Sequence, residues 1–149
     1  MTIKQKVHQH YLRQVQDKID AFKDMITALT EDSKNDAKGS AGDKHETALS
    51  MMHIEQEKLN RKLAEILQQK SILDKIDSST LSEKIALGSL VQANSMMLFI
   101  ATALPKITVD GKTIIAVSPQ SPLGSKLLGH QVGFVFEING TPYAIESVV

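Results

Sequence analysis

The sequence predicts an α+β fold in which an antiparallel helical coiled-coil hairpin precedes a small, mostly antiparallel sheet domain with one short helix. Composition changes near Asp77, because all four prolines and six of the eight glycines in the 149-residue chain follow it. Before Asp77, apolar residues recur every three or four positions, which is typical of amphipathic helices. After Asp77 they form short runs with a period of two, which is typical of strands. We therefore expect a hairpin at residues 1–76, a linker at 77–86 and an α+β domain at 87–149.

Two long helices are expected before Asp77, the first of about thirty residues and the second from Lys44 to Ile76. The first has its apolar stripe at Ile3, Val7, Tyr11, Val15, Ile19, Phe22, Ile26 and Leu29. The second has apolar residues seven apart at Met52, Leu59, Ile66 and Leu73, and Leu63 and Ile76 widen the same face. Neither helix is stable alone in water, but folding back at about residues 32–43 lets the two stripes bury each other. Each arm is about 45 Å long at about 1.5 Å per residue.

Short strands and tight turns are expected after the linker. Leu87–Ala93 and Met96–Ala103 read as strands, and Asp110-Gly111 and Asn139-Gly140 are strong hairpin signals. A short helix is expected in the segment 121–129, because Ser before Pro is typical of a helix start and Gly of a helix end.

The overall composition excludes several classes of function. Lys plus Arg and Asp plus Glu both number 17, so no net charge drives the protein onto nucleic acid or an anionic membrane. The chain contains no Cys, which excludes disulfides, thiolate metal sites and cysteine nucleophiles. No signal peptide and no membrane span of about 20 apolar residues is recognisable, so we expect a cytoplasmic protein.

The stretch "GSAGDKHETALSMM" at residues 39–52 places Asp43 and Glu46 where the second helix is expected to begin. Asp-x-x-Glu before an apolar run is a common capping box, which stabilises a helix by about 1 kcal/mol. The same spacing also lets both carboxylates point one way and share a cation. Since Mg²⁺ prefers six oxygen ligands and releases water reluctantly, we expect two carboxylates alone to leave the free protein without bound metal.

Other candidate sites receive little support from the sequence. His8 and His10 diverge on a helix, and His45 and His53 have no close third ligand, so a histidine metal site is not expected. The serines near residue 121 have no histidine and acid partners suggested by position, because His130 lies beyond the short helix.

The segment "SPQSPLGSKLLGHQVG" at residues 118–133, placed after a long helical hairpin, resembles the bacterial Gre family of transcript-cleavage factors. The resemblance spans most of the chain and implies an FKBP-like carboxy-terminal domain. Its motif is Ser-x-x-Ser-Pro-aliphatic-small, two aliphatic residues and a later Gly, matched here by Ser118, Ser121, Pro122, Leu123, Gly124, Leu127, Leu128 and Gly133. The resemblance suggests that Ser121, Pro122, Leu123 and Gly124 contact a partner. Lys126 and Phe134 depart from the pattern, and we expect both to face outward or toward an edge.

The expected bend between the helices also resembles that family. The family shows Gly-Asp-x-x-Glu there, and this chain has Gly42-Asp43-Lys44-His45-Glu46. The family continues with Asn and then Ala-Glu-Tyr, whereas this chain continues with Thr47, Ala48, Leu49 and Ser50. The chain therefore resembles a divergent member of the family.

The resemblance implies a transcription elongation factor that is not itself an enzyme. Its hairpin would enter the secondary channel of RNA polymerase and present an acidic tip near residues 32–46. Asp43 and Glu46 would help to hold a Mg²⁺ shared with the polymerase, which would cleave backtracked RNA. Two alternatives stay open: a channel-binding regulator that inhibits without cleavage, and a coiled-coil adaptor with no polymerase role.

Overall fold

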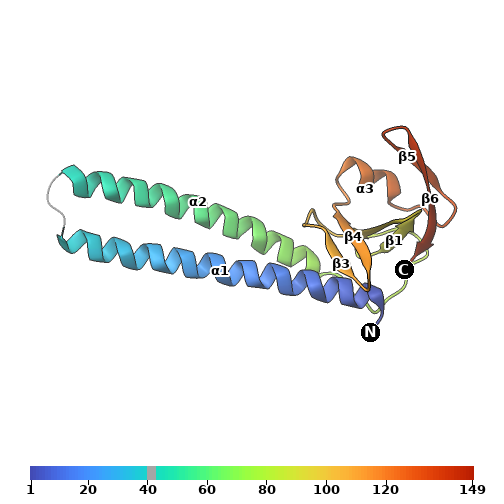
Figure 1. Ribbon diagram of the computed structural model, residues 1–149, viewed down its shortest axis with the longest axis horizontal. Helices are drawn as coiled ribbons and strands as arrows, with labels where there is room; N and C mark the ends of the chain where they lie inside the picture. The colour runs from blue at the N-terminus through green and yellow to red at the C-terminus, as the bar shows by residue number, and fades with distance from the viewer. Residues whose placement is uncertain (40–42) are drawn as a thin grey trace. The chain divides into compact units, whose positions relative to one another are not determined.

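The computed structural model describes the backbone of residues 1–39 and 43–149 and the side chains of residues 1–32 and 46–149. Contacts divide the chain into two compact units (Figure 1). Met1–Arg13 and Ser71–Val149 form one, called the sheet unit below, and Gln14–Lys70 form the other, called the helix unit. This division falls inside the two long helices, so it does not test the boundaries expected from the sequence at residues 76 and 87. Those boundaries stay a prediction.

The two predicted helices are confirmed as α1 (Ile3–Gly39) and α2 (Asp43–Asp74). Within the helix unit they run antiparallel (Figure 1), and the Gln56 Nε2 atom donates a hydrogen bond to Thr30 Oγ1 at 3.1 Å. The predicted stripes are buried at Val15, Ile19 and Ile66 and half-buried at Phe22, Ile26, Leu29, Met52, Leu59 and Leu63. Among the residues that the structure describes, no helix has an apolar stretch long enough to cross a lipid bilayer.

The sheet unit contains six strands and one short helix, as an α+β class requires. The strands are β1 (Leu90–Ala93), β2 (Met96–Ile100), β3 (Ile107–Val109), β4 (Lys112–Val117), β5 (Val135–Ile138) and β6 (Thr141–Val148), and the helix is α3 (Pro122–Leu127). Their order across the sheet is β3-β4-β2-β1-β6-β5. Four neighbouring pairs are antiparallel, but β2 and β4 are parallel, with Met97 opposite Ile114 and Ile100 opposite Val117. The sheet is therefore mixed but mostly antiparallel, as predicted.

Both predicted turns have the backbone conformation that their residues favour. Asp110 and Gly111 have φ angles of 51° and 74° between β3 and β4, and Asn139 and Gly140 have 52° and 81° between β5 and β6. Two successive positive φ angles match the right-handed twist of a hairpin. A third turn, at Asn94 with a φ of 55°, joins β1 to β2 and was not predicted.

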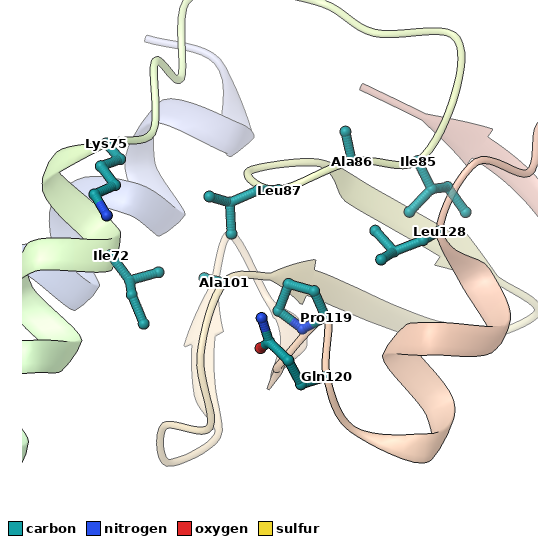
Figure 2. Close-up of a pocket in the computed structure, with 9 residues that line it drawn as sticks. All are labelled: Ile72, Lys75, Ile85, Ala86, Leu87, Ala101, Pro119, Gln120 and Leu128. Carbon is teal, nitrogen blue, oxygen red and sulfur yellow. The ribbon is translucent and has the colours of Figure 1, made fainter.

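The segment predicted as a linker, residues 77–86, makes specific contacts within the sheet unit. Asp77 accepts hydrogen bonds from the backbone and side chain of Ser79, which lower the pKa of its carboxyl. Ile85 is buried in the core, and its backbone exchanges hydrogen bonds with Gly129 and His130 at 2.8 and 2.9 Å. Ile85 also lines a pocket at the surface of this unit (Figure 2).

The first turns of α1 bury three polar side chains on one face, each bonded to a backbone carbonyl oxygen of the sheet unit. Lys4 Nζ donates to Thr80 O at 2.7 Å, His8 Nε2 donates to Leu73 O at 2.7 Å and Tyr11 Oη donates to Pro105 O at 2.8 Å. Burial lowers the pKa of Lys4 against an opposing effect of Asp77, and burial raises the pKa of Tyr11 to about 12. The Tyr11 ring also stacks on that of Phe99.

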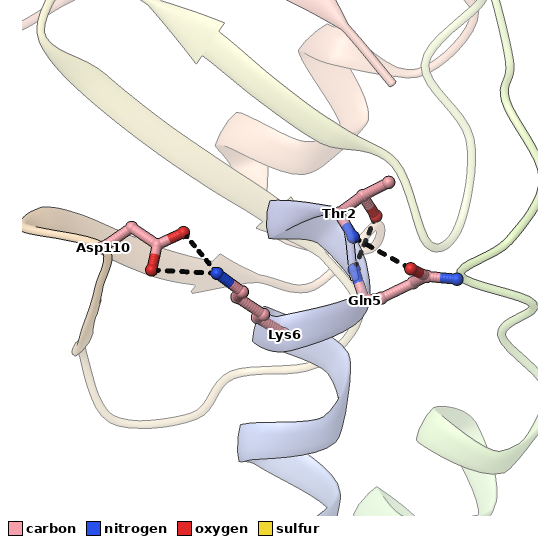
Figure 3. Close-up of polar contacts among 4 residues, drawn as sticks. All are labelled: Thr2, Gln5, Lys6 and Asp110. Carbon is pink, nitrogen blue, oxygen red and sulfur yellow. Dashed lines mark hydrogen bonds and ion pairs between the residues drawn. The ribbon is translucent and has the colours of Figure 1, made fainter.

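Exposed contacts reinforce the same end of α1 (Figure 3). Thr2 and Gln5 form a reciprocal capping pair, in which Gln5 N donates to Thr2 Oγ1 and Thr2 N donates to Gln5 Oε1. Lys6 Nζ lies 3.0 and 3.2 Å from the two carboxylate oxygens of Asp110 in the β3–β4 turn. An ion pair this exposed contributes at most about 1 kcal/mol, so the buried face of α1 dominates its attachment.

Replacing Tyr11 with Phe tests the buried hydroxyl. The Tyr11 pKa rises from 10.0 to about 12 on folding, so between pH 10 and about 12 the folded protein keeps a proton that the unfolded chain loses. The stabilisation from the hydroxyl is therefore fully present below pH 10 and is lost as the pH rises from 10 to about 12. We expect wild type to exceed Tyr11→Phe by about 1 kcal/mol in unfolding free energy near neutral pH.

Urea unfolding of both proteins from neutral to alkaline pH measures this difference. Lys4 is present in both proteins, so its own titration cancels. A gap between wild type and Tyr11→Phe that stays constant up to the upper pKa would contradict the predicted role of burial.

Candidate functional site

The predicted acidic tip lies at the start of α2. Asp43 is the first residue of this helix, and Glu46 lies within the first turn with an exposed side chain. The side chains of Asp43 and of its neighbour His45 lie outside the described residues. The pairing of the Asp43 and Glu46 carboxylates therefore stays a prediction, supported by their spacing on one helix.

The side chain of Glu46 is exposed, so its carboxylate is accessible to a magnesium ion. Asp43 and Glu46 together supply at most four carboxylate oxygens, fewer than the six that Mg²⁺ prefers. Among the described residues, no group of three or more His, Asp or Glu side chains is placed to hold a metal ion. That Asp43 and Glu46 share a Mg²⁺ with another molecule stays a prediction.

The predicted partner-binding residues Ser121, Pro122, Leu123 and Gly124 form the start of α3. Ser121 is the N-cap: its Oγ accepts from Gly124 N at 3.0 Å and donates to Ser118 O at 2.7 Å. Pro122 occupies the first turn, where its missing N–H is not needed. Leu123 packs against the core, and Pro122 is exposed. Local structure therefore accounts for most of this motif, and its contact with a partner stays a prediction.

Gly124 is required by a close approach of two backbone segments. A Cβ atom at this position would lie 1.9 Å from Ser118 O and 2.8 Å from Ser118 C. Both contacts are with backbone atoms, which cannot swing aside as a side chain can. The small residue of the motif therefore holds α3 against the turn that precedes it.

The two positions that depart from the family motif differ in their surroundings. Lys126 is exposed, as expected. Phe134 is half-buried against the core, and its ring stacks on His130 with centroids 3.5 Å apart and an interplanar angle of 8°. Phe134 therefore does not face outward, but it directly precedes β5, the strand at the edge of the sheet, which was the other alternative. It belongs to an aromatic row that continues through Phe136 and Tyr143.

Two buried polar residues, Lys4 and His8, were missed in the sequence. Lys is almost never fully buried unless it is paired, and His is intermediate in burial, so neither residue belongs to the expected apolar stripe. Their spacing carried a signal, because Lys4, His8, Tyr11 and Val15 fall at successive helical positions and all four are buried.

Comparisons with known proteins show a distant structural likeness. No protein-family model matches the chain, and no curated protein sequence matches it. The chain is similar to the solved structure of the transcription factor Gfh1, with 16% sequence identity over 92% of each chain and a TM-score of 0.36. A likeness this weak does not by itself establish a shared function.

Substituting Gly124 tests the close approach at the start of α3. We expect Gly124→Ala to lose about 3 kcal/mol or more of unfolding free energy, because the added methyl overlaps the Ser118 carbonyl. Ser125→Ala on the same helix is the control: Ser125 is exposed, and its loss should cost about 0.5 kcal/mol at most. Chemical denaturation followed by circular dichroism measures both. Equal midpoints for the two variants would refute the proposed need for glycine.

Proposed function

We propose that this protein is a transcription elongation factor of Gre type that binds RNA polymerase through its secondary channel. The observation that carries the proposal is the position of the Gly-Asp-x-x-Glu motif. Asp43 begins α2 at the connection between two long antiparallel helices, and Glu46 is exposed in the first turn. A motif resembling that of the cleavage factors thus coincides with one end of a helical pair.

The dimensions of the helix unit suit entry into a narrow channel. It consists of Gln14–Lys70, which lie in α1, α2 and their connection. Two packed helices are about 20 Å across, and the 26 residues from Gln14 to Gly39 span about 39 Å at 1.5 Å per residue. A globular domain of similar mass would be wider and would be excluded from such a channel.

The proposed role of Asp43 and Glu46 is to supply oxygen ligands and negative charge at the active centre of the polymerase. Mg²⁺ in such a centre lowers the pKa of water and stabilises charge on the attacked phosphate. The chain itself would then catalyse no reaction alone. Its carboxylates would complete a metal site, and the polymerase would cleave the backtracked RNA.

The residues after Glu46 favour a second candidate, a channel-binding regulator that inhibits the polymerase without stimulating cleavage. Thr47, Ala48, Leu49 and Ser50 differ from the pattern of the cleavage factors, and Thr47 and Ser50 are exposed beside Glu46 on α2. Side chains there would contact the same surroundings as the carboxylates. This candidate uses the same partner and the same helix unit, but it predicts inhibition of the polymerase instead of RNA cleavage.

A backtracked elongation complex assembled with RNA polymerase tests these candidates. The first candidate predicts RNA cleavage on adding the protein, and a loss of roughly tenfold or more for Asp43→Asn or Glu46→Gln, because each removes a proposed metal ligand. Glu57→Gln is a matched control, since Glu57 is an exposed acid of α2 outside the predicted tip. It should leave the cleavage rate within about twofold of wild type.

Other results would reject the proposal. Binding that inhibits transcription without cleavage would support the second candidate and overturn the first. A chain that does not co-migrate with the polymerase would overturn both and leave the adaptor function. The binding measurement must therefore accompany the cleavage measurement for each variant.

A further inference from the structure

The sheet unit contains an open pocket of about 450 Å³, within the range typical of small-molecule sites. Ile72, in the last turn of α2, and Lys75, directly after this helix, lie on one side in Figure 2, and Ile85 and Leu128 lie on the other. Leu87 lies between them (Figure 2). The pocket thus joins segments that are far apart in the sequence.

The walls of the pocket are aliphatic. Leu87 and Leu128 are unusually exposed for leucines, at 43% and 39%, so a bound ligand would remove apolar surface from water. Among the described residues that line the pocket, none is aromatic. A planar ring would find no stacking partner here, whereas a flexible hydrocarbon chain suits these walls.

The polar side chains of the pocket are hydrogen-bond donors. Among the described lining residues they are Lys75 and Gln120, and none is acidic. Gln120 Oε1 accepts a hydrogen bond from Ser118 Oγ at 2.7 Å, which orients the amide and leaves Nε2 with its two protons as the donor. An ammonium and an amide N–H group at the edge of an apolar pocket are complementary to a carboxylate.

We propose that this pocket binds a small aliphatic carboxylate, with its chain against Leu87 and Leu128 and its charged end at Lys75. Cations are disfavoured by Lys75, and inorganic anions leave the exposed leucines uncovered. A second pocket of the sheet unit, of about 260 Å³, is lined by Glu83, whose charge would repel the same ligand. Of these two pockets, the larger one therefore suits an aliphatic carboxylate better, because it combines a positive charge with exposed apolar surface.

The proposed site is independent of polymerase binding. Its residues lie in the sheet unit, whereas Glu46 lies in the helix unit. Failure of the cleavage experiment would leave the pocket proposal standing, and failure of ligand binding would leave the elongation-factor proposal standing. Ligand binding to the full chain is the direct readout.

Titration of the isotope-labelled full chain with hexanoate, octanoate and decanoate, followed by NMR, tests the proposal. We expect shifts at the pocket residues and an affinity that rises about two- to fourfold for each added CH₂ group. Lys75→Gln should weaken octanoate binding by about two- to fivefold, because the exposed ion pair is lost. The same change should leave the weaker binding of octan-1-ol unaltered. Lys106→Gln, at an exposed lysine that does not line the pocket, is the matched control.

Several outcomes would overturn the proposal. These are equal affinity of wild type for octanoate and octan-1-ol, no dependence on chain length, or equal effects of the two lysine variants. Much tighter binding of a leucine-terminated tripeptide than of octanoate would overturn the small-molecule assignment and indicate a peptide site. Denaturation midpoints of both variants, measured in parallel, would show that a lost affinity is not a loss of folding.

Discussion

The sheet unit depends on the hydrogen bonds of three polar side chains buried on the first turns of α1. Lys4, His8 and Tyr11 donate to carbonyl oxygens of three segments: the turn after α2, the last turn of α2 and the connection between β2 and β3. A buried donor without an acceptor costs about 1–3 kcal/mol, so each contact constrains where its segment lies. Burial of Val7 stabilises the packing of α1 in the sheet unit. The three hydrogen bonds fix which residues of α1 lie against each segment.

The sequence predicted those features of the fold that depend on neighbouring residues. The period of the apolar residues is a property of one helix, and the Asp110-Gly111 and Asn139-Gly140 turns are set by the residues that adopt positive φ. Features that depend on distant residues were not predictable in the same way. The parallel pairing of β2 with β4 requires a connection to cross between them, and alternation along a strand does not specify its neighbour. Ile85 shows the same limit, because a polar segment around it reads as a linker while its side chain joins the core.

The same distinction applies to the candidate sites. Asp43 and Glu46 are three residues apart in the sequence, so a shared helix turn could be expected directly. Lys4 and His8 lie on a predicted amphipathic helix, but the carbonyls that accept their hydrogen bonds come from distant residues. Lys75 and Gln120 are 45 positions apart and line the same pocket only because it forms between segments of the folded sheet unit. No local pattern in the sequence predicts that pair.

The two motifs that resemble the Gre family carry different kinds of information. Ser121 caps α3 and Gly124 permits a close backbone approach, so the motif at residues 118–124 is explained by the needs of this fold. The start of α2 needs only one capping residue, so local structure does not require both acids there. A capping Glu46 would direct its oxygens back toward the backbone, and a ligating Glu46 would direct them to a metal, so the same oxygens cannot do both. Because a capping interaction is worth only about 1 kcal/mol, a metal site completed by another protein can displace it. The tip motif is therefore compatible with both functions in turn: helix capping in the free protein and metal binding in a complex.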